Sequence, residues 1–100
     1  MRCIIIMLFI KKLVWDDWNV EHISRHRIVP EEIEEVCRRH PIVQRGTKRN
    51  RMVLLGRTLD DRLLSIILEN KGKNTYYPIT AYDAGPEDET LYQRIRGGDT

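Results

Sequence analysis

Seven basic residues lie between positions 38 and 57 of the sequence, and no acidic residue interrupts them. They are Arg38, Arg39, Arg45, Lys48, Arg49, Arg51 and Arg57. This segment carries +7 whereas the whole chain carries +2, so the rest of the chain carries −5. Such clustering is typical of a surface that binds phosphate groups or an acidic partner. The alternative is a solvated hairpin that is basic without binding anything.

RNA cleavage without a metal needs three kinds of group. A base activates the ribose 2′-hydroxyl, an acid protonates the leaving oxygen, and cations stabilise the charge of the transition state. Arginine suits the last role because its planar fork matches a phosphate. The predicted phosphate-binding residues are Arg45, Lys48, Arg49, Arg51 and Arg57. Arg49 and Arg51 would share one face if that stretch is extended, because alternate residues of a strand point the same way.

Two histidines and two tyrosines are candidates for proton transfer and for positioning a phosphate. His22 and His26 lie one helical turn apart, and histidine titrates near neutrality. Either could act as acid or base, or could instead pack against the sheet with a satisfied hydrogen bond. Tyr82 and Tyr92 could orient a phosphate or stack on a base. Their alternative role is packing in the core or at its rim.

A zinc site is the other use that these histidines could have. His22-x3-His26 has suitable metal spacing, and Cys37-x2-His40 supplies two more ligand types. However, Cys37 also fits the buried stripe of its helix, and the spacing between the two pairs matches no zinc-finger pattern. We therefore predict neither a metal nor another cofactor.

The elements that would position these residues follow from apolar periodicity and turn residues. A strand is predicted at 9–15, then a helix capped by Asp16 or Asp17 and ending at Arg27, then a helix at 30–40. Three strand-like runs follow, namely the pair 42–45 and 50–57, then 63–69, then 76–82, before a closing helix at 86–96. The order β-α-α-β-β-β-α, with short turns, predicts an α+β domain with an antiparallel sheet and helices packed on it. Trp15 and Trp18 are expected in the core.

Length and composition favour a single cytoplasmic domain. One hundred residues, 41% hydrophobic and 32% charged, are ordinary for one globular unit. Two cysteines make no disulfide framework, which favours a reducing compartment. The apolar run 3–10 is far shorter than the roughly 20 residues of a spanning helix, and no cleavage site follows it. Residues 1–8 are expected to be an extension or a misassigned start, with Met7 as the alternative start, and 97–100 a flexible tail.

Several short motifs, taken in their order and spacing, resemble the BrnT family of toxins over residues 9 to 93. Trp15-Asp16-Asp17 follows the first strand. Gly56-Arg57-Thr58 precedes Arg62-Leu63-Leu64 and an apolar strand. Tyr77-Pro78-Ile79-Thr80-Ala81 comes next, with Ala84 and Leu91-Tyr92 beyond. The resemblance implies a RelE-like fold and a ribonuclease that arrests translation. It also implies a cognate antitoxin with a ribbon-helix-helix domain, in a complex that represses its own operon.

The resemblance also bears on individual residues. His26 falls at the family's helix-end histidine, and His22 stands where asparagine is common. Tyr82 replaces a usual arginine, and Asp88 falls nearest a glutamate of the last helix. The expected catalytic set is therefore His22, His26, Tyr82, Asp88 and Tyr92. The leading prediction is a metal-independent endoribonuclease toxin that acts on mRNA, free or on the ribosome, with no membrane partner. The alternative is a member of the fold that binds antitoxin or RNA without cleavage.

Overall fold

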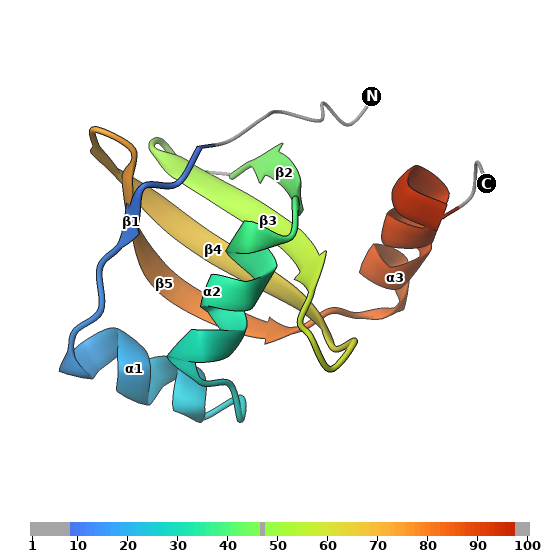
Figure 1. Cartoon of the computed structure of the whole chain (residues 1–100), viewed down its shortest axis with the longest axis horizontal. Helices are drawn as coiled ribbons and strands as arrows, with labels where there is room; N and C mark the ends of the chain where they lie inside the picture. The colour runs from blue at the N-terminus through green and yellow to red at the C-terminus, as the bar shows by residue number, and fades with distance from the viewer. Residues whose placement is uncertain (1–8, 47, 98–100) are drawn as a thin grey trace.

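The computed structural model describes residues 9–46 and 48–97 of the chain. This described part forms a five-stranded mixed sheet and three α-helices (Figure 1). The strands are β1 (Lys12–Leu13), β2 (Ile42–Arg45), β3 (Arg51–Arg57), β4 (Leu63–Gly72) and β5 (Thr75–Asp83). The helices are α1 (Asp17–Ser24), α2 (Pro30–Arg38) and α3 (Pro86–Tyr92), and α3 continues as a π-helical turn, Gln93–Gly97. The predicted extension 1–8 and residues 98–100 of the predicted tail lie outside the described residues.

The α+β prediction is confirmed, but the predicted order and sheet are wrong in two respects. The pair 42–45 and 50–57 forms two separate strands, so the sheet has one strand more than the predicted order allows. The sheet order is β1-β5-β4-β3-β2, and β1 runs parallel to β5 rather than antiparallel. Parallel neighbours need a long connection. Here the chain forms α1, α2 and the three strands β2, β3 and β4 between β1 and β5. β1 is also shorter than the predicted strand 9–15.

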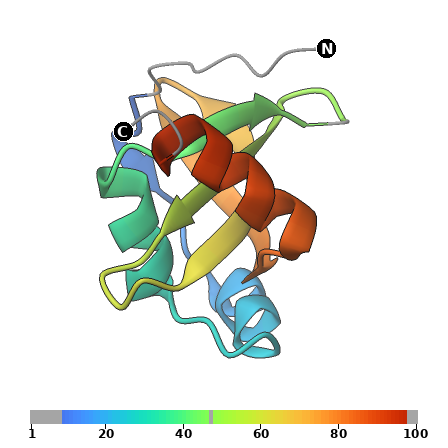
Figure 2. The ribbon, with the colours of Figure 1, turned by 90° about the vertical axis from the view of Figure 1, so that its right-hand side faces the viewer.

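Two apolar clusters lie on opposite faces of the sheet. Leu54 of β3 joins Ile23 of α1 and Ile33 of α2 in the larger cluster. Its neighbour Leu55 points the other way, as alternate strand residues do, and packs with residues of the C-terminal helix such as Leu91. Helices α1 and α2 therefore cover one face, and α3 lies over the other (Figure 2).

The start of α1 explains why one tryptophan prediction is wrong. Asp16 caps the helix, as predicted, by accepting from the backbone N–H of Asn19, whose own side chain accepts from the Asp16 N–H. The Asn19 amide then turns inward and donates to the carbonyls of Val14 and Pro78. Because Asn19 takes the inward position, Trp18 faces outward and is 54% exposed. Trp15 is partly buried against the core and donates from its indole nitrogen to Glu34.

Among the described residues, no helix has the length and apolar character needed to cross a membrane.

Candidate functional site

Four of the predicted phosphate-binding residues meet at the β2–β3 turn, and we call Arg45, Lys48, Arg49 and Arg51 the basic hairpin. The turn is tight: the Gly46 N–H donates to the Arg51 carbonyl. A Cβ at Gly46 would lie 2.9 Å from that carbonyl oxygen, so only glycine fits without displacement. Asn50 takes the left-handed conformation that asparagine tolerates, with φ of 63°. Arg45, Lys48 and Arg49 are exposed and Arg51 is half-buried, so all four cations reach the surface.

The basic hairpin differs from four other arginine sites in its partners. Arg25, Arg38, Arg57 and Arg62 each form an ion pair with an acidic side chain. None of the four hairpin residues forms an ion pair within the described parts of the chain. Glu69 stands opposite Arg51 but pairs with Lys71, so the hairpin cations have no direct acidic partner in the described structure and are available to an external anion.

Arg57, the fifth predicted phosphate ligand, lies elsewhere and is already engaged. It is six residues from Arg51 along β3, which places it roughly 20 Å away at the other end of the strand. Its guanidinium lies 2.6 Å from Glu89 of α3, 3.4 Å from Asp61, and 5.2 Å from the centre of the Tyr92 ring. The prediction that Arg57 acts together with the hairpin arginines is therefore wrong in its geometry.

The contacts of Arg57 also locate two predicted catalytic residues. Tyr92 packs against the second apolar cluster and the Arg57 cation, which matches its alternative role at the rim of the core. Asp88 lies in the first turn of α3, and among the described residues it forms no hydrogen bond or ion pair with the hairpin or the histidines. Its neighbour Glu89 meets Gln93 and Arg57 instead, and their hydrogen bonds hold the pKa of Glu89 below its usual range.

Three other predicted catalytic residues do come together, in a line of rings that we call the aromatic row. Trp18 stacks on His22, with ring centres 4.7 Å apart and ring planes within 9°. His22 meets His26 edge-on at 6.4 Å, and His26 meets Tyr82 edge-on at 6.3 Å. His26 and Tyr82 are exposed and His22 is half-buried. The row therefore links one face of α1 to the end of β5 and leaves two ionisable rings open to solvent.

The residue that organises this region is Arg62, which the sequence reasoning did not select. Its guanidinium binds Asp83 at 2.7 Å, Glu32 at 3.1 Å, and the backbone carbonyls of Arg27 and His26. Hydrogen bonds from Arg62 lower the pKa of Asp83. The only sequence signal was the position of Arg62 inside a motif. Because all its donors point at protein acceptors, Arg62 holds the aromatic row in place but is not free for a phosphate.

The basic hairpin and the aromatic row are two separate surfaces. Tyr82 pairs with Ser65, and Ser65 with Leu55, so these three residues form one row across the sheet. Arg51 lies four residues before Leu55 on β3, roughly 13 Å away along the strand and two strands to the side. The remaining hairpin residues lie further out. The hairpin cations and the histidines, which were assigned to one cleavage reaction, are therefore not brought together.

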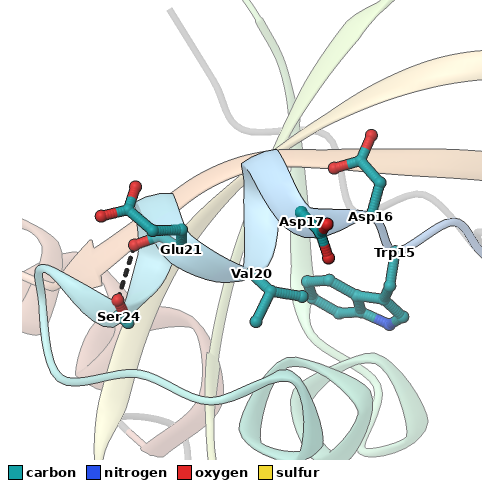
Figure 3. A pocket seen from close by; sticks show the side chains of 6 residues that line it. All are labelled: Trp15, Asp16, Asp17, Val20, Glu21 and Ser24. Atoms are coloured by element: carbon teal, nitrogen blue, oxygen red, sulfur yellow. Dashed lines mark hydrogen bonds between the residues drawn. The ribbon is translucent and has the colours of Figure 1, made fainter.

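A shallow depression of about 340 Å³ beside α1 is a third surface feature (Figure 3). It is lined by Trp15, Asp16, Asp17, Val20, Glu21 and Ser24. Asp16 is engaged by Asn19 and by the Tyr77 hydroxyl, and Glu21 by Arg25. With three carboxylates at its wall, this depression repels phosphate and is not part of an RNA surface.

The zinc alternative finds no support in the described structure. Burial raises the pKa of the Cys37 thiol to about 12, so a thiolate ligand is disfavoured there. His22 and His26 contact other rings rather than Cys37 or His40. Across residues 9–46 and 48–97, no three His, Cys, Asp or Glu side chains gather as a metal site.

No protein-family model, curated protein or solved structure matches this chain.

Proposed function

We propose that this chain is an RNA-binding toxin of a bacterial type II toxin–antitoxin pair, acting in the cytoplasm, and that the basic hairpin holds the RNA backbone. The observation that carries this proposal is the set of four surface cations without acidic partners among the described residues. Cations of this kind bind nucleic acid by displacing the counterions of the phosphates. The motif order resembling BrnT supports the toxin role, a RelE-like arrangement of the sheet and a ribbon-helix-helix antitoxin as partner.

The first prediction concerns the double variant Arg49→Ala/Arg51→Ala. Each lost phosphate contact lowers the salt dependence of RNA affinity by about 0.7 in the slope of log K against log salt. The double variant should therefore show a slope smaller by about 1.4, measured by fluorescence anisotropy with a labelled single-stranded RNA. In cells, wild-type chain expressed without antitoxin should arrest growth, and the double variant should relieve the arrest.

A matched control is Arg25→Ala/Arg38→Ala, which removes the same charge from exposed helical ion pairs. Its salt slope should stay at the wild-type value. If both double variants lower the slope equally, overall charge rather than the hairpin governs binding. Normal growth on strong induction of soluble protein would count against a toxin.

Cleavage of RNA is the second candidate function, and the contact between His26 and Tyr82 favours it. An exposed imidazole can take or give a proton near neutral pH, and the neighbouring phenol could orient a phosphate. If the chain cleaves RNA, the residues of the aromatic row perform the cleavage. The basic hairpin then binds phosphates of the same RNA that lie further from the cleaved bond.

His26→Ala should then lower the rate of RNA cleavage by about 100-fold or more without changing RNA affinity. The assay uses purified protein with a chelator present and resolves the fragments on a gel. The control is His40→Asn, because His40 is exposed and asparagine tolerates its left-handed φ of 55°. RNA that wild-type protein binds but leaves intact would select the non-catalytic alternative.

A further inference from the structure

We infer that the basic hairpin is one part of a longer line of cations, which crosses the end of the whole sheet and holds the backbone of a single-stranded RNA across the strands. This inference rests on the proposed function and extends its binding surface to residues from two other segments. We call this surface the cationic sheet end. It consists of Lys11, Lys12, Arg45, Lys48, Arg49, Arg51, Lys71 and Lys73.

The register of the sheet places these cations at one end. Lys12 of β1 lies opposite Thr75, the first residue of β5, and the Lys11 N–H donates to the Asn74 carbonyl. Lys71 lies at the end of β4, and Lys73 lies in the turn between β4 and β5 that precedes Thr75. The start of β1, this connection and the start of β3 all lie toward the upper left of Figure 1.

The hairpin continues the line on the other side of β4. Arg51, the first residue of β3, lies opposite Glu69 near the end of β4. Arg45, the last residue of β2, lies opposite Met52. The line therefore runs from β1 to β2 across the full width of the sheet. Four spacings between adjacent strands, each about 4.8 Å, make it about 19 Å long.

The charge balance of this surface favours a polyanion. Glu69 is the only acid within these strand ends and turns, and its pair with Lys71 is long, at 3.9 Å, and exposed. Exposed pairs of this kind contribute little and do not bury the cation. The eight cations and Glu69 sum to +7, so the remainder of the chain carries −5. The fold therefore concentrates positive charge at one end of the sheet.

The same distribution selects a single strand over a duplex. One line of cations meets one backbone, whereas a duplex would bring a second backbone toward the acidic part of the molecule. The line consists of strand ends and turns, and within the described chain no helix projects from this end to enter a groove. Lysine and arginine contacts to phosphates position the backbone without reading bases, so binding should be independent of sequence.

The test is the triple variant Lys11→Gln/Lys12→Gln/Lys71→Gln, measured with a single-stranded oligouridine of about 12 nucleotides, within the range that extended binding grooves cover. Lys73 is left in place because its φ of 55° restricts replacements. The salt slope should fall by about 2, at about 0.7 per lost contact. Oligoadenine should bind like oligouridine, and a duplex of equal length more weakly.

The control Arg25→Ala/Arg38→Ala/Arg94→Ala removes three exposed cations from elsewhere and should keep the wild-type slope. Thermal unfolding of each variant checks that it folds. A wild-type slope for the lysine variant, alongside a lowered slope for Arg49→Ala/Arg51→Ala, overturns the extended surface but leaves the proposed function standing. If the lysine variant and Arg49→Ala/Arg51→Ala both keep the wild-type slope, the extended surface and the proposed function are both overturned. Tighter binding of the duplex overturns the single-strand assignment.

Discussion

Replacing Arg62 with alanine should lower the free energy of unfolding by about 2–3 kcal/mol. Its guanidinium joins Asp83 at the end of β5 to Glu32 in the first turn of α2. It also binds two carbonyls of the connection between α1 and α2. Removing one partner of a fully buried pair costs about 3–5 kcal/mol. Because the Arg62 side chain is 25% exposed and that of Asp83 is 62% exposed, water offsets part of that loss.

The measurement is urea unfolding of wild type, Arg62→Ala and Arg38→Ala. Arg38 pairs with Glu34 on an exposed helical surface at 3.8 Å, so its loss should cost only about 0.3–0.5 kcal/mol. Equal losses for both variants would mean that Arg62 makes no more than an ordinary surface pair. The His26 ring should also lose its fixed contact with Tyr82 in Arg62→Ala, because Arg62 holds the His26 carbonyl.

The stability difference between wild type and Arg62→Ala should depend on pH in a definite direction. The hydrogen bonds of Arg62 lower the pKa of Asp83 in the folded state relative to the unfolded chain. A carboxyl group of this kind stabilises the fold above its unfolded pKa, and the stabilisation is lost as pH falls through its folded pKa. The two proteins should therefore differ most at neutral pH and approach each other in acid. A difference that grows on acidification would contradict this assignment.

Local sequence signals predicted the elements well, because caps and turns depend on neighbouring residues. Asp16 caps α1, Pro30 and Pro86 begin helices, and the turn around Gly46 exposes the basic hairpin. These features need only residues within a few positions of one another.

The same signals could not predict which charged residues meet across the fold. Arg57 and Arg62 look alike in sequence, yet their partners Glu89 and Asp83 lie 32 and 21 residues away. Their pairing depends on where β5 and α3 fall relative to β3 and β4. The parallel placement of β1 beside β5 depends in the same way on distant strands. The sequence therefore grouped four hairpin cations that do lie together, but it joined them to Arg57 and to histidines that lie elsewhere.

The prediction that Trp18 is buried failed for a different reason, which is the burial of its neighbour Asn19. Replacing Asn19 is therefore expected to have a large effect on stability. Helical periodicity predicts that apolar residues face the core. Here the polar residue Asn19 is fully buried, and its side chain forms hydrogen bonds with three backbone groups. Its amide donates to the Val14 and Pro78 carbonyls at 3.0 Å, and its oxygen accepts from the Asp16 N–H at 2.9 Å. One side chain thus joins the end of the β1 segment, the helix cap and β5.

Asn19→Ala should therefore lower the free energy of unfolding by about 3 kcal/mol, since buried polar groups left unpaired cost about 1–3 kcal/mol each and do not add fully. Asn19→Asp should be at least as destabilising at neutral pH, because it keeps the acceptor for the Asp16 N–H but turns a carboxylate oxygen toward two carbonyls. Acidification should partly restore the stability of Asn19→Asp, whose protonated carboxyl can donate again, and should not restore the stability of Asn19→Ala.

Urea unfolding at neutral and acid pH measures the stability of both variants, with Asp17→Asn at an exposed position nearby as control. If alanine and aspartate at position 19 respond alike to acid, the amide does not serve as the donor that links α1 to β5.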